Sequence, residues 1–309
     1  MDETLGVLAH HGGLIVARPE LTVGILRAVS RPTGLELELE ARRPLDRRTA
    51  AERQADIRAG GPPATPAPRR LLPQYDEGLH LRVGRLDGDG RAHWEFATRS
   101  SSSSGDPAGG VHGPSLQMTV RMPPLFDTVS LVLAWPEIGF PETVVELPLP
   151  DRAAVDRGTV SVWDAPVRAT PPPAGLHYRD DDIPAVEPDP ETGRIVAPPQ
   201  VLSRSGEAVV VLTRLTEIGD ALSFELGCLA TVGIPHEMSL IPGASVAVVH
   251  DGEATWVRSH RAAASGGDRS FEAIAEYTVA RPAGDVLRLL ISWPAAGLPD
   301  ACVDLPLIP

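Results

Sequence analysis

Residues 129–150 read VSLVLAWPEIGFPETVVELPLP, and a second version of this stretch closes the sequence, where residues 287–309 read LRLLISWPAAGLPDACVDLPLIP. Each version is an alternating apolar run, a Trp-Pro pair, a Gly, another Pro and a second alternating run. A period of two is typical of half-buried strands. The stretch therefore predicts a pair of strands that the chain uses twice.

The Trp-Pro-x-x-Gly-x-Pro spacing indicates a structural corner. Pro removes a ladder donor, so the strand must end or bulge there, and Gly supplies the turn. A Trp repeated at equivalent strand positions is typical of a core plug, although an exposed aromatic can also bind sugars. The signature residues are Trp135, Pro136, Gly139, Pro141, Trp293, Pro294, Gly297 and Pro299.

Further matches between the two halves extend the repeat upstream of the corner. At fixed spacings the sequence pairs Arg27 with Arg214, Glu38 with Glu225, Trp94 with Trp256, and Leu116 with Phe271. The spacing changes only where we predict loops, which is typical of a duplicated β domain.

The expected fold is all-β, with two tandem Ig-like or fibronectin-like antiparallel β-sandwiches and little helix. We expect the first sandwich over residues 14–150, after a loose tail. A surface insertion at 43–78 includes a short helix at about 49–58. A Pro-rich acidic linker over 151–205 separates it from the second sandwich at 206–309.

A row of glutamates alternates with apolar residues in the run LELELEA at 35–41. Leu35, Leu37, Leu39 and Ala41 should face the core, and Glu36, Glu38 and Glu40 the other way. Such a row could bind a cation or a basic partner. The favoured interpretation is the solvated face of a strand.

The linker carries the only weak metal candidates, Asp180, Asp181 and Asp182. Oxygen-rich clusters can hold calcium, but an acidic run between Pro residues is more typical of a solvated linker.

Composition excludes several classes of function. The formal net charge is −13 and no Lys is present, which disfavours nucleic acid as a partner. No apolar run approaches a membrane span and no signal peptide is evident, so we expect a cytoplasmic protein. By strand parity Cys228 should face inward and Cys302 outward, so we expect no disulfide. We find no catalytic or cofactor motif.

The order of the motifs resembles a group of uncharacterised actinobacterial proteins. The matching pieces are Gly84, Asp89-Gly90-Arg91, the Ser/Gly-rich run at 100–113, and the corner at 135–141. The second copy keeps Asp251-Gly252 and its own corner but has Glu253 in place of Arg91. The resemblance implies a bacterial cytoplasmic protein and no particular activity.

Three hypotheses for function follow. The first is a non-enzymatic binding or interaction module with a protein partner, as a subunit of a larger assembly. The second is an enzyme or small-molecule binder with a site between the two sandwiches. The third is a calcium-stabilised structural protein.

Overall fold

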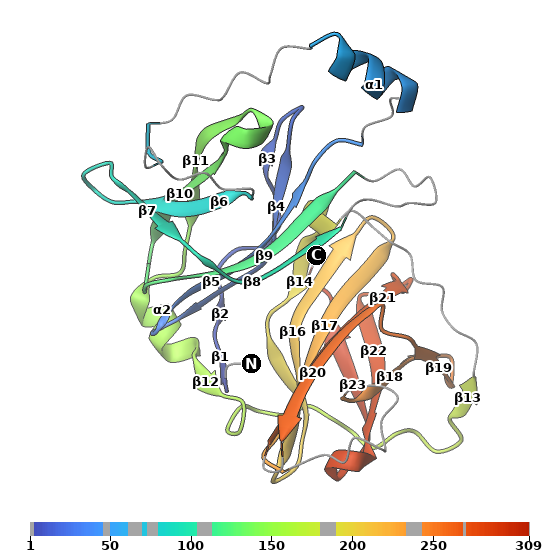
Figure 1. The fold of residues 1–309 in the computed structure, drawn as a ribbon. Coiled ribbons are helices and arrows are strands. Elements are labelled where there is room, and N and C mark those ends of the chain that lie inside the picture. The colour runs from blue at the N-terminus through green and yellow to red at the C-terminus, as the bar shows by residue number, and fades with distance from the viewer. Residues whose placement is uncertain are drawn as a thin grey trace.

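The computed structural model describes residues 3–45, 50–60, 70–72, 80–103, 113–179, 190–232, 243–267 and 270–308. Over these residues the chain forms two tandem Ig-like antiparallel β-sandwiches with little helix (Figure 1), which confirms the expected fold class. The helices are α1 (Ala50–Arg58), as predicted, and α2 (Arg152–Gly158). No helix in these ranges is long and apolar enough to cross a bilayer.

The first sandwich consists of two sheets. One has the order β2-β4-β5-β9-β8, with β3 also paired to β4, and the other has the order β11-β10-β6-β7. The strands are β2 (Val7–Leu8), β3 (Gly13–Ala17), β4 (Thr22–Arg31), β5 (Gly34–Arg42), β6 (Arg82–Leu86), β7 (Ala92–Glu95), β8 (Ala97–Ser103), β9 (Ser115–Met122), β10 (Thr128–Trp135) and β11 (Phe140–Pro148).

The second sandwich repeats this arrangement. One sheet has the order β14-β16-β17-β21-β20, with β15 also paired to β16, and the other has the order β13-β19-β18-β22-β23. The strands are β13 (His177–Arg179), β14 (Arg194–Ala197), β15 (Gln200–Arg204), β16 (Ala208–Ile218), β17 (Ala221–Ala230), β18 (Ser245–His250), β19 (Glu253–Val257), β20 (Arg261–Gly267), β21 (Ser270–Ala280), β22 (Val286–Trp293) and β23 (Leu298–Pro306).

Strand alternation builds a separate apolar core in each sandwich. Leu35, Leu37 and Leu39 of β5 lie in the first core, and Phe224 of β17 lies in the second. Cys228 also lies in the second core, as predicted from its parity.

The corner signature has the same conformation in both copies. A 3₁₀ turn begins at Pro136 and at Pro294, and each turn ends in a left-handed Gly: Gly139 with φ of 80° and Gly297 with φ of 70°. Each Gly donates its N–H to the preceding Pro carbonyl at 2.9 Å. This geometry explains the Gly, because a residue with a Cβ is strained there. The predicted structural corner is confirmed.

Two predicted boundaries are wrong. The supposed tail includes β1 (Thr4–Leu5), which pairs with β12 (Val160–Ser161), and β2. The predicted linker at 151–205 contains β14 and β15, which belong to the second sandwich. Their Pro-rich surroundings hid them, because edge strands tolerate Pro beside them.

The linker between the sandwiches is also partly packed. Tyr178 stacks on Trp256 at 6.0 Å between ring centroids, and Thr170 pairs with Cys302. Cys302 lies in an outer cluster with Leu290, away from the core that holds Cys228. The two thiols therefore face opposite sides of their sheets, as expected.

Strands β6 and β7 form a hairpin, after which the chain changes sheet. Phe96 separates β7 from β8, which pairs with β9 in the other sheet. Ser100–Ser103, the start of the Ser/Gly-rich run, are thus strand residues. The strand register also corrects the predicted match of Leu116 with Phe271. Ala41 and Cys228 occupy equivalent positions in the two copies, and Ala41 pairs with Leu116 while Cys228 pairs with Ala273, so Leu116 corresponds to Ala273.

The two sandwiches pack face to face through equivalent sheets (Figure 1). The sheet of β4, β5 and β9 lies against the sheet of β16, β17 and β21, and hydrogen bonds join Arg27 to Glu225 and Arg214 to Glu38. The outer strands β8 and β20 border this interface on one side.

Candidate functional site: a charged cleft between the sandwiches

The predicted solvated face of β5 is buried, which corrects the favoured interpretation of the glutamate row. Glu36, Glu38 and Glu40 are only 7%, 4% and 5% exposed. Their face of β5 is turned toward the second sandwich, where Glu38 accepts a hydrogen bond from Arg214. Alternation had identified the right face of the strand, but it contains no information about what packs on that face.

Matched β-bulges aim two arginines into this interface. The register shifts between Ile25 and Arg27 in β4, and between Leu212 and Arg214 in β16. Without the extra residue, Arg27 would share the core-facing side of Ile25, because side chains alternate along a strand. The bulge reverses this alternation and turns each guanidinium away from its own core.

Each arginine then bridges the two sandwiches. Arg27 Nη2 lies 2.9 Å from Glu36 Oε1 in its own sandwich, and Arg27 Nη1 lies 3.3 Å from Glu225 Oε1 in the other. Arg214 Nη1 lies 3.3 Å from Glu38 Oε1 across the interface, and Arg214 Nη2 lies 2.8 Å from Glu276 Oε1. We call Arg27, Arg214, Glu38, Glu225 and Glu276 the central cluster.

Neutral and peripheral groups complete the contacts of the central cluster. Gln117 donates to Glu38 at 2.6 Å and accepts from Arg261, and the Thr213 hydroxyl bonds to the Glu225 carboxylate. His260 Nε2 lies 3.4 Å from Glu276 Oε2. Three buried atoms of the central cluster make no hydrogen bond, namely Arg27 Nε, Glu38 Oε2 and Arg214 Nε, and the first two lie 3.3 Å apart as an ion pair.

The pKa values of Glu225 and Glu276, the two glutamates that the second sandwich contributes to the central cluster, are shifted in opposite directions. Burial raises the pKa of Glu225, against the opposing charges of Arg27 and Arg214. Burial acts in the same direction on Glu276, but the hydrogen bond from His260 and the charges of Arg214 and Arg261 outweigh it and hold its pKa at about 2. Glu276 is therefore a carboxylate at neutral pH, and Glu225 is the group of this pair that takes up a proton more readily.

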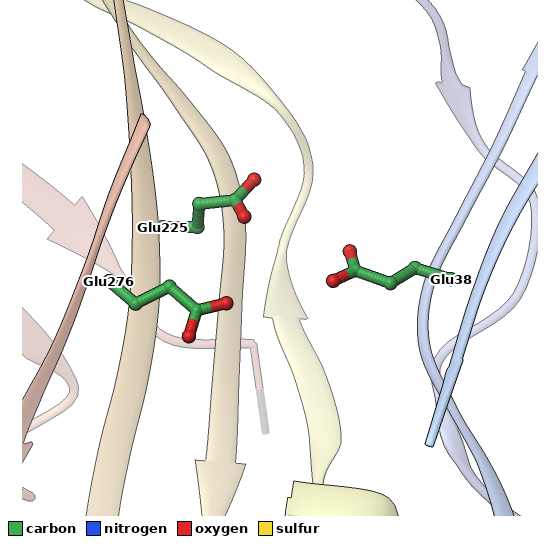
Figure 2. A group of neighbouring side chains, drawn as sticks. All are labelled: Glu38, Glu225 and Glu276. Carbon is green, nitrogen blue, oxygen red and sulfur yellow. The ribbon is translucent and has the colours of Figure 1, made fainter. Parts of the chain in front are cut away.

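Three carboxylates converge closely enough to suggest a metal centre. Oxygens of Glu38, Glu225 and Glu276 lie within 4.8 Å of one another, and Figure 2 shows the side chain of Glu38 directed at the other two. The guanidinium groups of Arg27 and Arg214 already pair with all three. Because these arginines supply the balancing charge, the arrangement is that of an ion-pair network.

Two cavities flank the central cluster. The larger, of about 320 Å³, lies between the edge strands β8 and β20, and the smaller, of about 250 Å³, lies toward β1. Arg27, Thr119, Glu225 and Ile274 line both cavities. They are therefore two parts of one cleft between the sandwiches, separated by these shared side chains.

A second ion pair anchors the chain before β14 to the first sandwich. Arg42 and Glu191 form a bidentate pair, with Nε to Oε1 at 2.6 Å and Nη2 to Oε2 at 3.1 Å. Glu191 is 3% exposed. Its backbone approaches Gly24 so closely that a Cβ on Gly24 would lie 2.1 Å from the Glu191 carbonyl oxygen. This contact fixes the start of the second sandwich against the first.

The predicted site residues have different outcomes. Asp180, Asp181 and Asp182 lie outside the described residues. The signature residues of the corner lie at the ends of the outer sheets, and none lines the cleft. The sequence did not predict the cleft itself. A signal for it was present, because the Arg and Glu at positions 27 and 38 of the first copy recur as Arg214 and Glu225 in the second.

The fold and site define a class of protein: a two-domain β-sandwich protein with a charged cleft between its domains. No protein-family model matches the sequence, and no curated protein matches it. Among solved structures, bovine butyrophilin is 9% identical with a TM-score of 0.21, over 90% of this chain and 93% of that chain. A conserved domain protein from Bacillus anthracis is 8% identical with a TM-score of 0.19, over 94% and 88%. Scores this low support no argument, and the resemblance to actinobacterial proteins stays a prediction.

Proposed function

We propose that the protein is a non-enzymatic binding module whose ligand site is the cleft between its two sandwiches. The observation that carries the proposal is the pair of cavities with a shared charged wall. Ligand sites are concave, occur preferentially between domains and combine apolar surface with a few polar groups. The larger cavity has this composition, with Ile274 beside Gln117 and Arg261.

The proposal combines the binding module of the first hypothesis with the inter-sandwich site of the second, and it places that site on other residues. The second hypothesis placed a site between the sandwiches but built it from linker acids, whereas the cleft is built from sheet residues. Its enzymatic version needs a nucleophile or base facing the cleft. His260, which pairs with Glu276 at 3.4 Å, lines neither cavity and is therefore not placed to act as that base.

A plugging variant tests the proposal. Ala263 of β20 lines the larger cavity and is exposed, so Ala263→Trp should fill the opening without disturbing a core. Ala264 lies on the opposite face of the same strand and is also exposed, so Ala264→Trp is the matched control. The three proteins are incubated with a small-molecule extract of the host, washed, and their bound compounds identified by mass spectrometry.

We expect that the unmodified protein and the control variant Ala264→Trp retain the same compound, and that Ala263→Trp does not retain it. Retention of no compound, or equal retention by all three proteins, would refute a ligand site in the cleft.

A second candidate is a protein-interaction module within a larger assembly, in which the cleft is only structural. It is favoured by β20, whose seven residues are all exposed and which pairs only with β21 among the described strands. A free strand edge is a template for pairing with an extended segment of another protein. Phe96 adds an aromatic side chain that is 88% exposed. A cytoplasmic location belongs to both proposals, and fractionation of host cells tests it.

A further inference from the structure

The larger cavity has a size suited to a small ligand. Its volume of about 320 Å³ is near the lower end of the range for ligand pockets, roughly 300–1,000 Å³. It is bounded by Ser100 and Ser101 on one edge strand and by Ala263 on the other. A molecule of about the size of a single sugar ring therefore matches it better than a peptide or a nucleotide.

The charges around this cavity are balanced. Arg27 and Arg261 line it together with three glutamates, and Arg214, which lies behind the lining, supplies a third positive charge, so every one of the six has an opposite charge within 4.0 Å. They are Arg27, Arg214, Arg261, Glu38, Glu225 and Glu276. An ionic ligand would add a charge without a partner to a partly desolvated site, which is costly. A neutral ligand leaves the balance intact.

The lining also offers both donors and acceptors to a neutral ligand. Ser101 and Thr119 carry hydroxyl groups on the face toward the cleft, and each can donate and accept. Beside them the cavity is lined by the half-exposed guanidinium of Arg261 and by the carboxylates of Glu38 and Glu276. Hydroxyl groups of a ligand match such a mixed wall, because a hydroxyl donates to a carboxylate and accepts from a guanidinium or another hydroxyl.

An apolar side chain completes the match. Ile274 lines the same cavity from the second sandwich, on the face of β21 that also carries Glu276. Sugars and cyclic polyols present C–H surfaces between their hydroxyl groups, and these can pack on such a side chain. From size, charge balance and lining together, we propose that the cleft binds a neutral polyhydroxylated small molecule of the sugar or cyclic polyol class. This inference rests on the proposed function.

The test uses probes of one size that differ in charge. D-glucose and myo-inositol are neutral, D-glucosamine carries a positive charge and D-glucuronate a negative one. Binding of each to the full protein is measured by isothermal titration calorimetry and by saturation-transfer NMR. We expect at least one neutral probe to bind at least tenfold more tightly than either charged probe, and its binding to be lost in Ala263→Trp but kept in Ala264→Trp.

The outcomes separate this inference from the proposed function. Equal or tighter binding of D-glucosamine or D-glucuronate, or no measurable binding of the neutral probes, overturns the sugar or polyol class. Neutral binding that survives in Ala263→Trp overturns the location. A charged or apolar compound retained from the host extract also overturns the class while the binding function stands. Absence of any retained compound removes the proposed function itself.

Discussion

Replacement of Arg214 tests whether the central cluster holds the two sandwiches together. The Arg214 side chain is 5% exposed, and it pairs with Glu38 at 3.3 Å and with Glu276 at 2.8 Å. Arg214→Met removes the charge and keeps most of the side-chain volume. Removing one partner of a buried ion pair typically costs about 3–5 kcal/mol, because the other charge is left uncompensated.

The structure places the expected cost at the lower end of that range. Arg27 remains 3.3 Å from Glu38, and Arg261 remains 3.9 Å from Glu276, so neither glutamate loses all of its positive neighbours. We therefore expect Arg214→Met to reduce the free energy of unfolding by about 3 kcal/mol.

The assay is urea unfolding followed by tryptophan fluorescence, with a surface ion pair as the control. Arg288 pairs with Asp304 at 2.5 Å, but the two side chains are 49% and 50% exposed. Exposed pairs contribute about 0–1 kcal/mol, so Arg288→Met should shift the urea midpoint little. If Arg214→Met is as stable as Arg288→Met, the central cluster does not stabilise the interface and the reasoning is refuted.

A double variant separates lost charge from lost packing. In Arg214→Met/Glu276→Gln the carboxylate that loses its closest positive partner is neutralised as well, so part of the lost stability should return, because less uncompensated charge stays buried. A double-mutant cycle with the two single variants gives the coupling energy. Additive effects would mean that Met simply packs badly.

Three further predictions concern single groups. The pKa of Glu276 is about 2 in the folded protein and 4.5 ordinarily, so its carboxylate adds about 3 kcal/mol of stability above pH 4.5, and this stability is lost as the pH falls toward 2. The difference in the free energy of unfolding between the unmodified protein and Glu276→Gln should therefore shrink as the pH falls from 4.5 toward 2. A difference that stays constant over this range would contradict the prediction. Gly139→Ala should destabilise the protein by about 1 kcal/mol, measured by thermal unfolding, because the φ of Gly139 is 80°. The control is Gly206→Ala, which should not destabilise the protein, because Gly206 has open space for a Cβ and no such φ. Equal losses of stability in the two variants would refute the corner argument. Burial raises the pKa of Cys228 to about 12, so in a Cys302→Ser background a thiol reagent should label it only after unfolding in urea, and rapid labelling of the native protein would contradict its core position.

The faces of the strands could be predicted from the sequence because they are local properties. The period of two in β5 places Leu37 in the core and Glu38 opposite, and the structure agrees. The repeated corner likewise follows from backbone chemistry at Pro136 and Gly139. These features depend on residues a few positions apart.

The cleft could not be predicted because it depends on contacts between distant parts of the chain. Glu38 meets Arg214 across 176 positions of sequence. A glutamate row on an exposed strand and one in a buried interface have the same alternation. The bulges were also hidden, since LTVGILRAV reads as an unbroken strand, although a bulge is needed to keep Arg27 out of the core. Edge strand β8 was missed for a different reason: its serines carry no apolar pattern, because one edge strand buries little.

The differences between the copies make the pairing of the first sandwich with the second more favourable than a pairing of two first sandwiches. On its interface side the first sandwich carries Glu36, Glu38 and Glu40, and the corresponding positions of the second are Ser223, Glu225 and Gly227. Two first sandwiches facing each other would bring six glutamates into one interface and would lack Glu191, the partner of Arg42. The second copy instead meets the crowded glutamate row with small residues and with Arg214. Loss of two glutamates from one copy thus removes like-charge repulsion that an identical pair would have, and such asymmetry specifies which surfaces pair. The same replacement of long side chains by Ser223 and Gly227 leaves less bulk between the sheets, so the asymmetry that orients the sandwiches is also compatible with the space in which we place the ligand.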